Sequence, residues 1–141
     1  MRAIMRLDLA DARRLIAGAT EKAKEIGVPM CIAVTDDGGH LIAFERMDGG
    51  RITSLTIAID KAFTASAARR ATHEIGAASQ PGAPTYGIFT ALGGRMMVVG
   101  GGLPVTWEGV VVGAIGVSSG TPAQDREVAQ AGIDAWTAAQ G

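Results

Sequence analysis

This chain has 141 residues, of which 48% are hydrophobic, 19% charged and 4% aromatic. We expect one domain over residues 1–141, because the length and the apolar content suffice for a folded core. Thirteen basic and 14 acidic residues leave a net charge of −1, so no nucleic-acid partner is expected. A lone cysteine excludes an internal disulfide, and no apolar run approaches the roughly 18 residues of a membrane span. We therefore expect a cytoplasmic protein without a membrane partner.

The first half of the chain predicts helices around a β-hairpin. Apolar residues recur at helical spacing after Asp8, a suitable N-cap, and Gly27 is a suitable stop. An Asp-Gly-rich turn separates two apolar stretches typical of a hairpin. The elements predicted here are a helix over residues 8–26, strands over 30–36 and 40–46, and helices over 51–70 and 72–78.

The second half predicts strands and a final helix. Thr121, Pro122 and Gln124 form a strong helix start, with a capping box and proline in the first turn. The elements predicted here are an irregular segment over residues 79–94, strands over 95–99, 103–107 and 110–117, and a helix over 121–138. Hairpin-linked strands with packed helices make an α+β domain, in the order α-β-β-α-(α)-β-β-β-α.

Glycine is concentrated in one part of the chain. Twelve of the 20 glycines lie between Gly76 and Gly120. Three of them, at positions 100–102, directly precede Leu103 and Pro104, which is more glycine than a hairpin turn needs. This run is either a ligand-lining wall of bare backbone N–H groups or a bulged turn.

Two residues are candidate ligands for a metal or haem iron. His40 follows a glycine turn, where it is either an exposed turn residue or an axial ligand. Cys31 begins an apolar strand, where it is either a small buried hydrophobe or a thiolate ligand. His73 stands among charged residues, and we interpret it as a solvated residue at a helix end.

Other polar residues are candidates for holding a carboxylate. Lys61 lies on the second predicted helix, either on a solvated face or in a site. Arg46 ends a strand, where a guanidinium can form a forked contact to a carboxylate or a structural ion pair. Residues 116–120 match the nucleophile-elbow pattern G-x-S-x-G. Both histidines precede this pattern, so we do not predict a hydrolase of that kind.

Several of these motifs form one ordered pattern. It comprises VTDDGGHL at 34–41, RMDG at 46–49, KAFTA at 61–65, GGLPV at 101–105 and VGAIGVSSGTPAQD at 112–125. The pattern closely resembles the GlcG/HbpS family, which includes the C-terminal domain of the PduO adenosyltransferase. The resemblance implies a five-stranded antiparallel sheet, assembly into dimers and rings such as octamers, and haem binding. Some members bind iron through D-x-x-E, but here Asp125 and Glu127 have a different spacing.

The first functional hypothesis is a haem- or tetrapyrrole-binding protein with a glycine-lined pocket. His40 or Cys31 would be the axial ligand, and Arg46 or Lys61 would lie near the propionates. The residues expected to contact the ligand are Arg46, Lys61, Thr64, Gly101, Gly102 and Pro104.

Two further hypotheses remain open. One is a catabolic enzyme that acts on a small carboxylate-bearing metabolite. Its catalytic candidates are Lys61, Asp36 and His40, with Asp125 as a further acid or base. The other is a non-catalytic subunit whose role is assembly.

Overall fold

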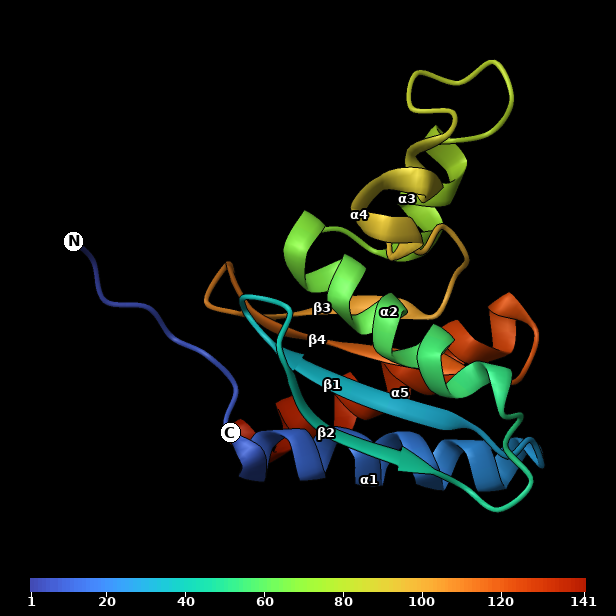
Figure 1. The fold of residues 1–141 in the computed structure, drawn as a ribbon. Coiled ribbons are helices and arrows are strands. Elements are labelled where there is room, and N and C mark those ends of the chain that lie inside the picture. Colours follow the sequence, from blue (N-terminus) through green and yellow to red (C-terminus); the bar gives the residue numbers. More distant parts are fainter.

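The computed structural model describes residues 1–141, and it places one antiparallel sheet between two layers of helices (Figure 1). The sheet has the strand order β2-β1-β4-β3. The elements are α1 (Leu9–Ile26), β1 (Cys31–Asp36), β2 (Leu41–Arg46), α2 (Thr53–Ala68), α3 (Thr72–Ala78), the 3-10 helix η1 (Ile88–Thr90), α4 (Ala91–Gly94), β3 (Gly102–Trp107), β4 (Val110–Ser118) and α5 (Pro122–Gln140). The predicted α+β class is confirmed. No helix combines the length and the apolar character that a membrane span requires.

The predicted five-stranded sheet is wrong, because the sheet has four strands and residues 95–99 are not a strand. Side chains from two helices hold this segment instead. The Thr64 hydroxyl donates to the Arg95 carbonyl at 3.0 Å and accepts from the Met97 N–H at 2.9 Å. The Thr72 hydroxyl donates to the Val99 carbonyl at 2.7 Å. These contacts take up backbone groups that a sheet ladder would need.

The two longest helices begin where the sequence predicts them. Asp8 caps α1 in a capping box with Asp11, and Thr121 caps α5 in the same way with Gln124. Gly27 ends α1 in the left-handed conformation, with φ of 70°. Both helices pack on one face of the sheet, where their apolar stripes meet the larger strand side chains. These strand side chains are Ile32, Val34, Leu103, Val105, Ile115 and Val117.

The opposite face of the sheet is built from small residues so that α2 can lie close to it. Ala33, Ala114 and Gly116 alternate with the larger side chains and point toward α2. A Cβ on Gly116 would lie 2.1 Å from the Ala58 carbonyl oxygen, nearer than any real contact. The glycine content of β4 is therefore a condition for the close approach of this helix.

We predict that Gly116→Ala lowers the free energy of unfolding by about 1–3 kcal/mol, because the added methyl forces α2 away from β4. Urea-induced unfolding measures this loss. Gly38→Ala is a matched control, since the nearest atom to its added methyl is the movable ring of His40. Equal stability of Gly116→Ala and the wild type would contradict the packing argument.

Candidate functional site

The predicted site residues lie toward two ends of the sheet and do not form one pocket. Asp36 and His40 lie at the turn between β1 and β2. Arg46 ends β2, six residues beyond this turn, and pairs in register with Cys31. Six strand residues span about 20 Å, so His40 and Arg46 lie far apart. The structure therefore does not bring His40 together with Arg46.

The β1–β2 turn orients His40 through the carboxylate of Asp36. Oδ1 of Asp36 accepts the backbone N–H groups of Gly38 at 2.8 Å and His40 at 3.0 Å. The same oxygen lies 3.2 Å from Nδ1 of His40, whose side chain is 81% exposed. Burial raises the pKa of Asp36, but the hydrogen bonds from His40 and Gly38 outweigh it and lower the pKa overall. A histidine held at Nδ1 by a carboxylate leaves Nε2 free for a metal, which is the usual geometry of a metal-binding histidine.

An aromatic ring and several cations adjoin this turn. Phe63 packs on the turn backbone, where a Cβ on Gly39 would lie 2.9 Å from the ring. The Arg95 guanidinium lies 3.8 Å over the centroid of the same ring. Arg69 donates to the Asp37 carbonyl at 2.6 Å, and Arg6 pairs with the Asp37 carboxylate at 2.8 Å. The sequence does not indicate that these four residues adjoin the turn, except that the adjacent carboxylates of Asp36 and Asp37 favour cationic neighbours.

A groove of about 290 Å³ lies beside this turn, between the N-terminal segment and the start of β4. Five of its eight lining residues are hydrophobic, and two are arginines. The lining residues are Arg2, Ala3, Ile4, Met5, Asp37, Arg69, Val110 and Val111. The groove combines an apolar surface with two guanidinium groups, but His40 is not among its lining residues.

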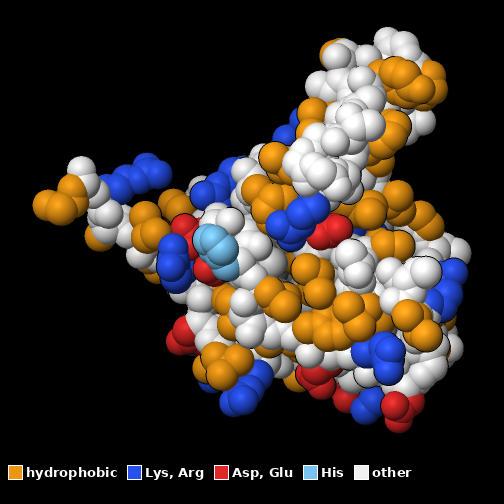
Figure 2. Space-filling view, in the orientation of Figure 1, with side chains coloured by type: hydrophobic (Ala, Val, Ile, Leu, Met, Phe, Trp, Pro, Cys, Tyr) orange, Lys and Arg blue, Asp and Glu red, His pale blue; other side chains and the backbone are white.

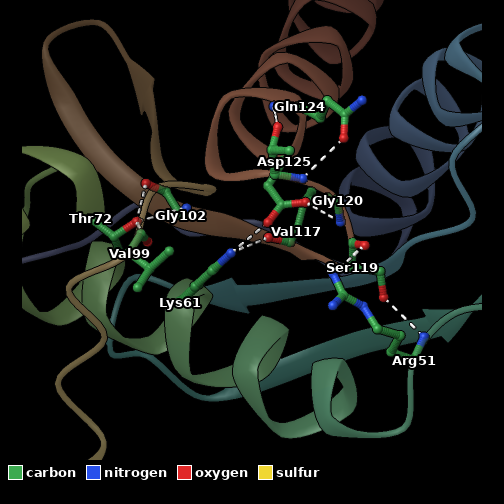
Figure 3. Close-up of polar contacts among 11 residues, drawn as sticks. Arg51, Lys61, Thr72, Val99, Gly102, Val117, Ser119, Gly120, Gln124 and Asp125 are labelled. Atoms are coloured by element: carbon green, nitrogen blue, oxygen red, sulfur yellow. Dashed lines mark hydrogen bonds and ion pairs between the residues drawn. The ribbon is translucent and has the colours of Figure 1, made fainter.

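Lys61 is buried and holds an internal carboxylate (Figure 3). Its Nζ lies 2.9 Å from Oδ2 of Asp125 and 2.9 Å from the Val117 carbonyl oxygen. The side chains of Lys61 and Asp125 are 1% and 4% exposed. Burial lowers the pKa of the Lys61 amine, although the hydrogen bond to Asp125 opposes this change. Lys61 is thus not on a solvated face. Its partner Asp125 lies 64 residues away, so residue spacing in the sequence does not indicate the pair.

The glycine run packs directly on this ion pair. Gly101 has φ of 125°, and its Cβ would lie 2.9 Å from Nζ of Lys61. A Cβ on Gly102 would lie 2.5 Å from the Lys61 carbonyl oxygen, and the Gly102 N–H donates to the Thr72 hydroxyl. Pro104 is half-buried in the edge strand β3. Gly101 and Gly102 thus lie close to groups of their own chain, and the lining of a ligand by Gly101, Gly102 and Pro104 stays a prediction.

A second polar cluster joins the end of β4 to the segment before α2. The Arg51 guanidinium donates to the Ser119 carbonyl at 2.6 Å, and the Arg51 backbone N–H donates to the Ser119 hydroxyl at 3.0 Å (Figure 3). Ser119 has φ of 121°, which is strained for a residue with a side chain. Burial raises the pKa of the nearby Cys31 thiol, and Ser119 and Arg46 offset it only in part. Burial therefore disfavours the thiolate that an axial ligand requires.

Comparisons with known proteins support the family resemblance. A family model described as "Haem degrading protein HbpS-like" matches residues 7–134. An uncharacterised 15.0 kDa protein of Citrobacter freundii, from the dhaT-dhaS intergenic region, is 42% identical over 134 residues, 95% of this chain and 94% of that protein. The solved structure of Klebsiella pneumoniae protein ORFY has a TM-score of 0.96 and 38% identity, covering 98% of this chain and 95% of that one. A solved PduOC:haem complex has a TM-score of 0.89 and 34% identity, covering 93% and 95%.

We predict that Lys61→Met lowers the free energy of unfolding by about 3–5 kcal/mol, because the Asp125 carboxylate is left buried without a cation. The double variant Lys61→Met, Asp125→Asn should be destabilised by less than the sum of the losses in Lys61→Met and Asp125→Asn alone, because it keeps no unpaired buried charge. Urea-induced unfolding gives all the values. Lys24→Met removes a lysine whose side chain is 64% exposed, as a control, and should change stability little. Full stability of Lys61→Met would contradict the structural role of the pair.

A second prediction concerns pH. The Nδ1 atom of His73 is buried without a hydrogen-bond partner, and burial, together with the charge of Arg126, lowers the pKa of His73. In the unfolded chain His73 is protonated near pH 6.5, whereas in the folded chain it is protonated only at lower pH. The free energy of unfolding should therefore fall as the pH drops from 7 to 5.5.

His73→Gln should remove this dependence of the free energy of unfolding on pH. Urea-induced unfolding at each pH measures the effect. The carboxyl groups of Asp11 and Asp36 do not account for it, because their lowered pKa values shift their effect below about pH 4. An unchanged slope in His73→Gln would show that another group titrates.

Proposed function

Because this chain belongs to the HbpS-like family, we propose that it binds haem or a related tetrapyrrole, with His40 as the axial ligand. The observation that carries this proposal is the pairing of His40 with Asp36. The carboxylate fixes the ring and selects the tautomer whose Nε2 lone pair faces outward. His40 is also the exposed member of the two predicted ligands, whereas Cys31 is fully buried.

The groups beside His40 fit the remaining chemistry of haem. A haem needs an apolar surface for its ring and cations for its propionates. The adjacent groove supplies Ile4, Val110 and Val111 as apolar contacts, and Arg2 and Arg69 as carboxylate partners. When bound, the haem would supply an iron whose reactivity depends on its axial ligand. The role of the chain's own residues is to hold that iron and to balance the propionate charge.

Self-association is part of the proposal, as a dimer or a larger ring up to an octamer. None of the three cavities of the chain is lined by His40. A haem on His40 would thus leave one face in water unless a second copy covers it. We place the protein in the cytoplasm, where a free and buried cysteine such as Cys31 stays reduced.

The enzyme hypothesis has less support from the geometry. It needs Lys61 to hold a substrate carboxylate, with an acid or base close by. Lys61 and Asp125 instead neutralise each other in the interior. Asp36 and His40 lie at the β1–β2 turn, away from Arg46. Binding, without a stated reaction, is therefore the function that we propose.

We predict that His40→Ala weakens haem binding at least about tenfold, or changes the ligation of the iron, because the axial nitrogen is lost. Titration of haem, followed by the Soret band, measures both effects. Asp36→Asn keeps His40 but removes the charge that orients it, and should weaken binding by about 10–100-fold.

His73→Ala is the matched control, since His73 lies on α3 rather than in the turn. It should bind haem as the wild type does. An unchanged spectrum and affinity in His40→Ala would remove His40 from the site. Absence of any Soret shift in the wild type would overturn the proposed function itself.

A further inference from the structure

A small cavity lies where the N-terminal segment, the first turn of α1 and the end of α5 meet. Its volume is about 110 Å³, and five of its eight lining residues are hydrophobic. These five are Met5, Leu7, Trp107, Val112 and Trp136. An apolar cavity of about 150 Å³ holds a benzene molecule. This cavity therefore has room for a compact group of slightly smaller size.

Both tryptophans of the chain line this cavity. Trp107 ends β3 and Trp136 lies on α5. Their ring centroids are 5.9 Å apart and their planes meet at 79°, so the two rings form a nearly right-angled corner. Among aromatic side chains, the indole ring of tryptophan attracts cations most strongly. This corner therefore favours a cation over a neutral molecule of the same shape.

One carboxylate also lines the cavity, that of Asp11 in the first turn of α1. Its Oδ1 accepts the Nε1–H of Trp136 at 2.9 Å, and its Oδ2 accepts the backbone N–H of Asp8 at 3.0 Å. Burial raises the pKa of Asp11, but the hydrogen bonds from Asp8 and Trp136, with the charge of Arg14, outweigh it and lower the pKa overall. The carboxylate is therefore ionised at neutral pH and held beside the tryptophan corner.

The basic residue in the cavity wall, Arg6, has its charge balanced by another carboxylate. Nε of Arg6 lies 2.8 Å from Oδ1 of Asp37, and the Arg6 side chain is 51% exposed. Figure 2 shows basic and acidic side chains together where the N-terminal segment meets the body of the molecule. Asp11 takes part in none of the ion pairs of the chain. The cavity thus combines two indole rings with a negative charge that has no cationic partner.

We propose that this cavity binds the quaternary ammonium group of a small organic cation. A primary ammonium has three N–H donors to satisfy, whereas both oxygens of Asp11 already accept hydrogen bonds. A quaternary ammonium has no N–H donor, so charge attraction and contact with the indole rings suffice to hold it. Its methyl groups also fit the apolar walls at Met5 and Leu7. The cavity holds only this group, and the rest of the molecule lies outside it.

The test uses haem-free protein, so that its outcome is separate from that of the proposed function. Choline chloride should change the tryptophan fluorescence saturably, because both tryptophans line the cavity. Sodium chloride at the same ionic strength is the blank. The neutral alcohol with a tert-butyl group in place of the trimethylammonium group should bind at least about tenfold more weakly, and so should ethanolamine. No saturable change with choline, or equal affinity for either analogue, would overturn the proposal.

Variants of the cavity wall locate the binding site. Asp11→Asn removes the charge, and Trp107→Leu removes one ring while Trp136 still reports binding. Each should weaken choline binding at least about fivefold. Asp134→Asn, on the exposed side of α5, removes the same charge outside the cavity and should bind choline as the wild type does.

Urea-induced unfolding shows whether each variant is folded, because Asp11 also belongs to the capping box of α1. If Asp11→Asn does not fold, Trp107→Leu and the comparison of choline with its neutral analogue decide the question. Unchanged choline affinity in a folded Asp11→Asn or Trp107→Leu protein would place the cation elsewhere and overturn the proposal.

Discussion

The buried ion pair between Lys61 and Asp125 is the contact on which the arrangement of layers depends. It connects α2, on one face of the sheet, to the first turn of α5, on the other. A charge pair out of water is tolerated only when its remaining polar groups are also bonded. Here the Val117 carbonyl accepts from the amine, and the Gly120 N–H donates to the carboxylate. The pair therefore fixes the end of β4 as well as both helices.

The glycines follow from this constraint. Because the lysine amine reaches Asp125 of α5 past the end of β4, the backbone around it must come very close. Gly101 lies against the pair, Gly102 against the backbone of Lys61, and Gly116 against the backbone of α2. A side chain at any of these positions would separate the layers. Gly101, Gly102 and Gly116 thus serve internal packing. The exposed histidine lies instead at the turn at the other end of β1, where the Asp36 carboxylate holds His40.

Local signals predicted local structure well. Capping residues, the Asp-Gly turn and the strand of residues 110–117 depend on neighbours in the sequence, and each is present. The expected strand over 95–99 is wrong because Thr64 and Thr72, about 30 residues away, bond its backbone. The partner of Lys61 lies 64 residues away, and no spacing rule connects the two. For the same reason, the sequence does not indicate that Arg69 and Phe63 lie at the turn that carries His40.

The proposed haem binding and the proposed self-association are linked by the exposure of His40. An axial bond to an exposed histidine leaves most of a flat ring in water, so much of the binding energy must come from surfaces around it. The groove beside the turn supplies part of that surface. A neighbouring copy that covered the rest would bind haem more tightly than the separate chain. By thermodynamic linkage, haem would then favour the assembled form by the same factor. If His40 binds the iron as proposed, its exposure on a rigid turn would let the assembly of the chain respond to haem.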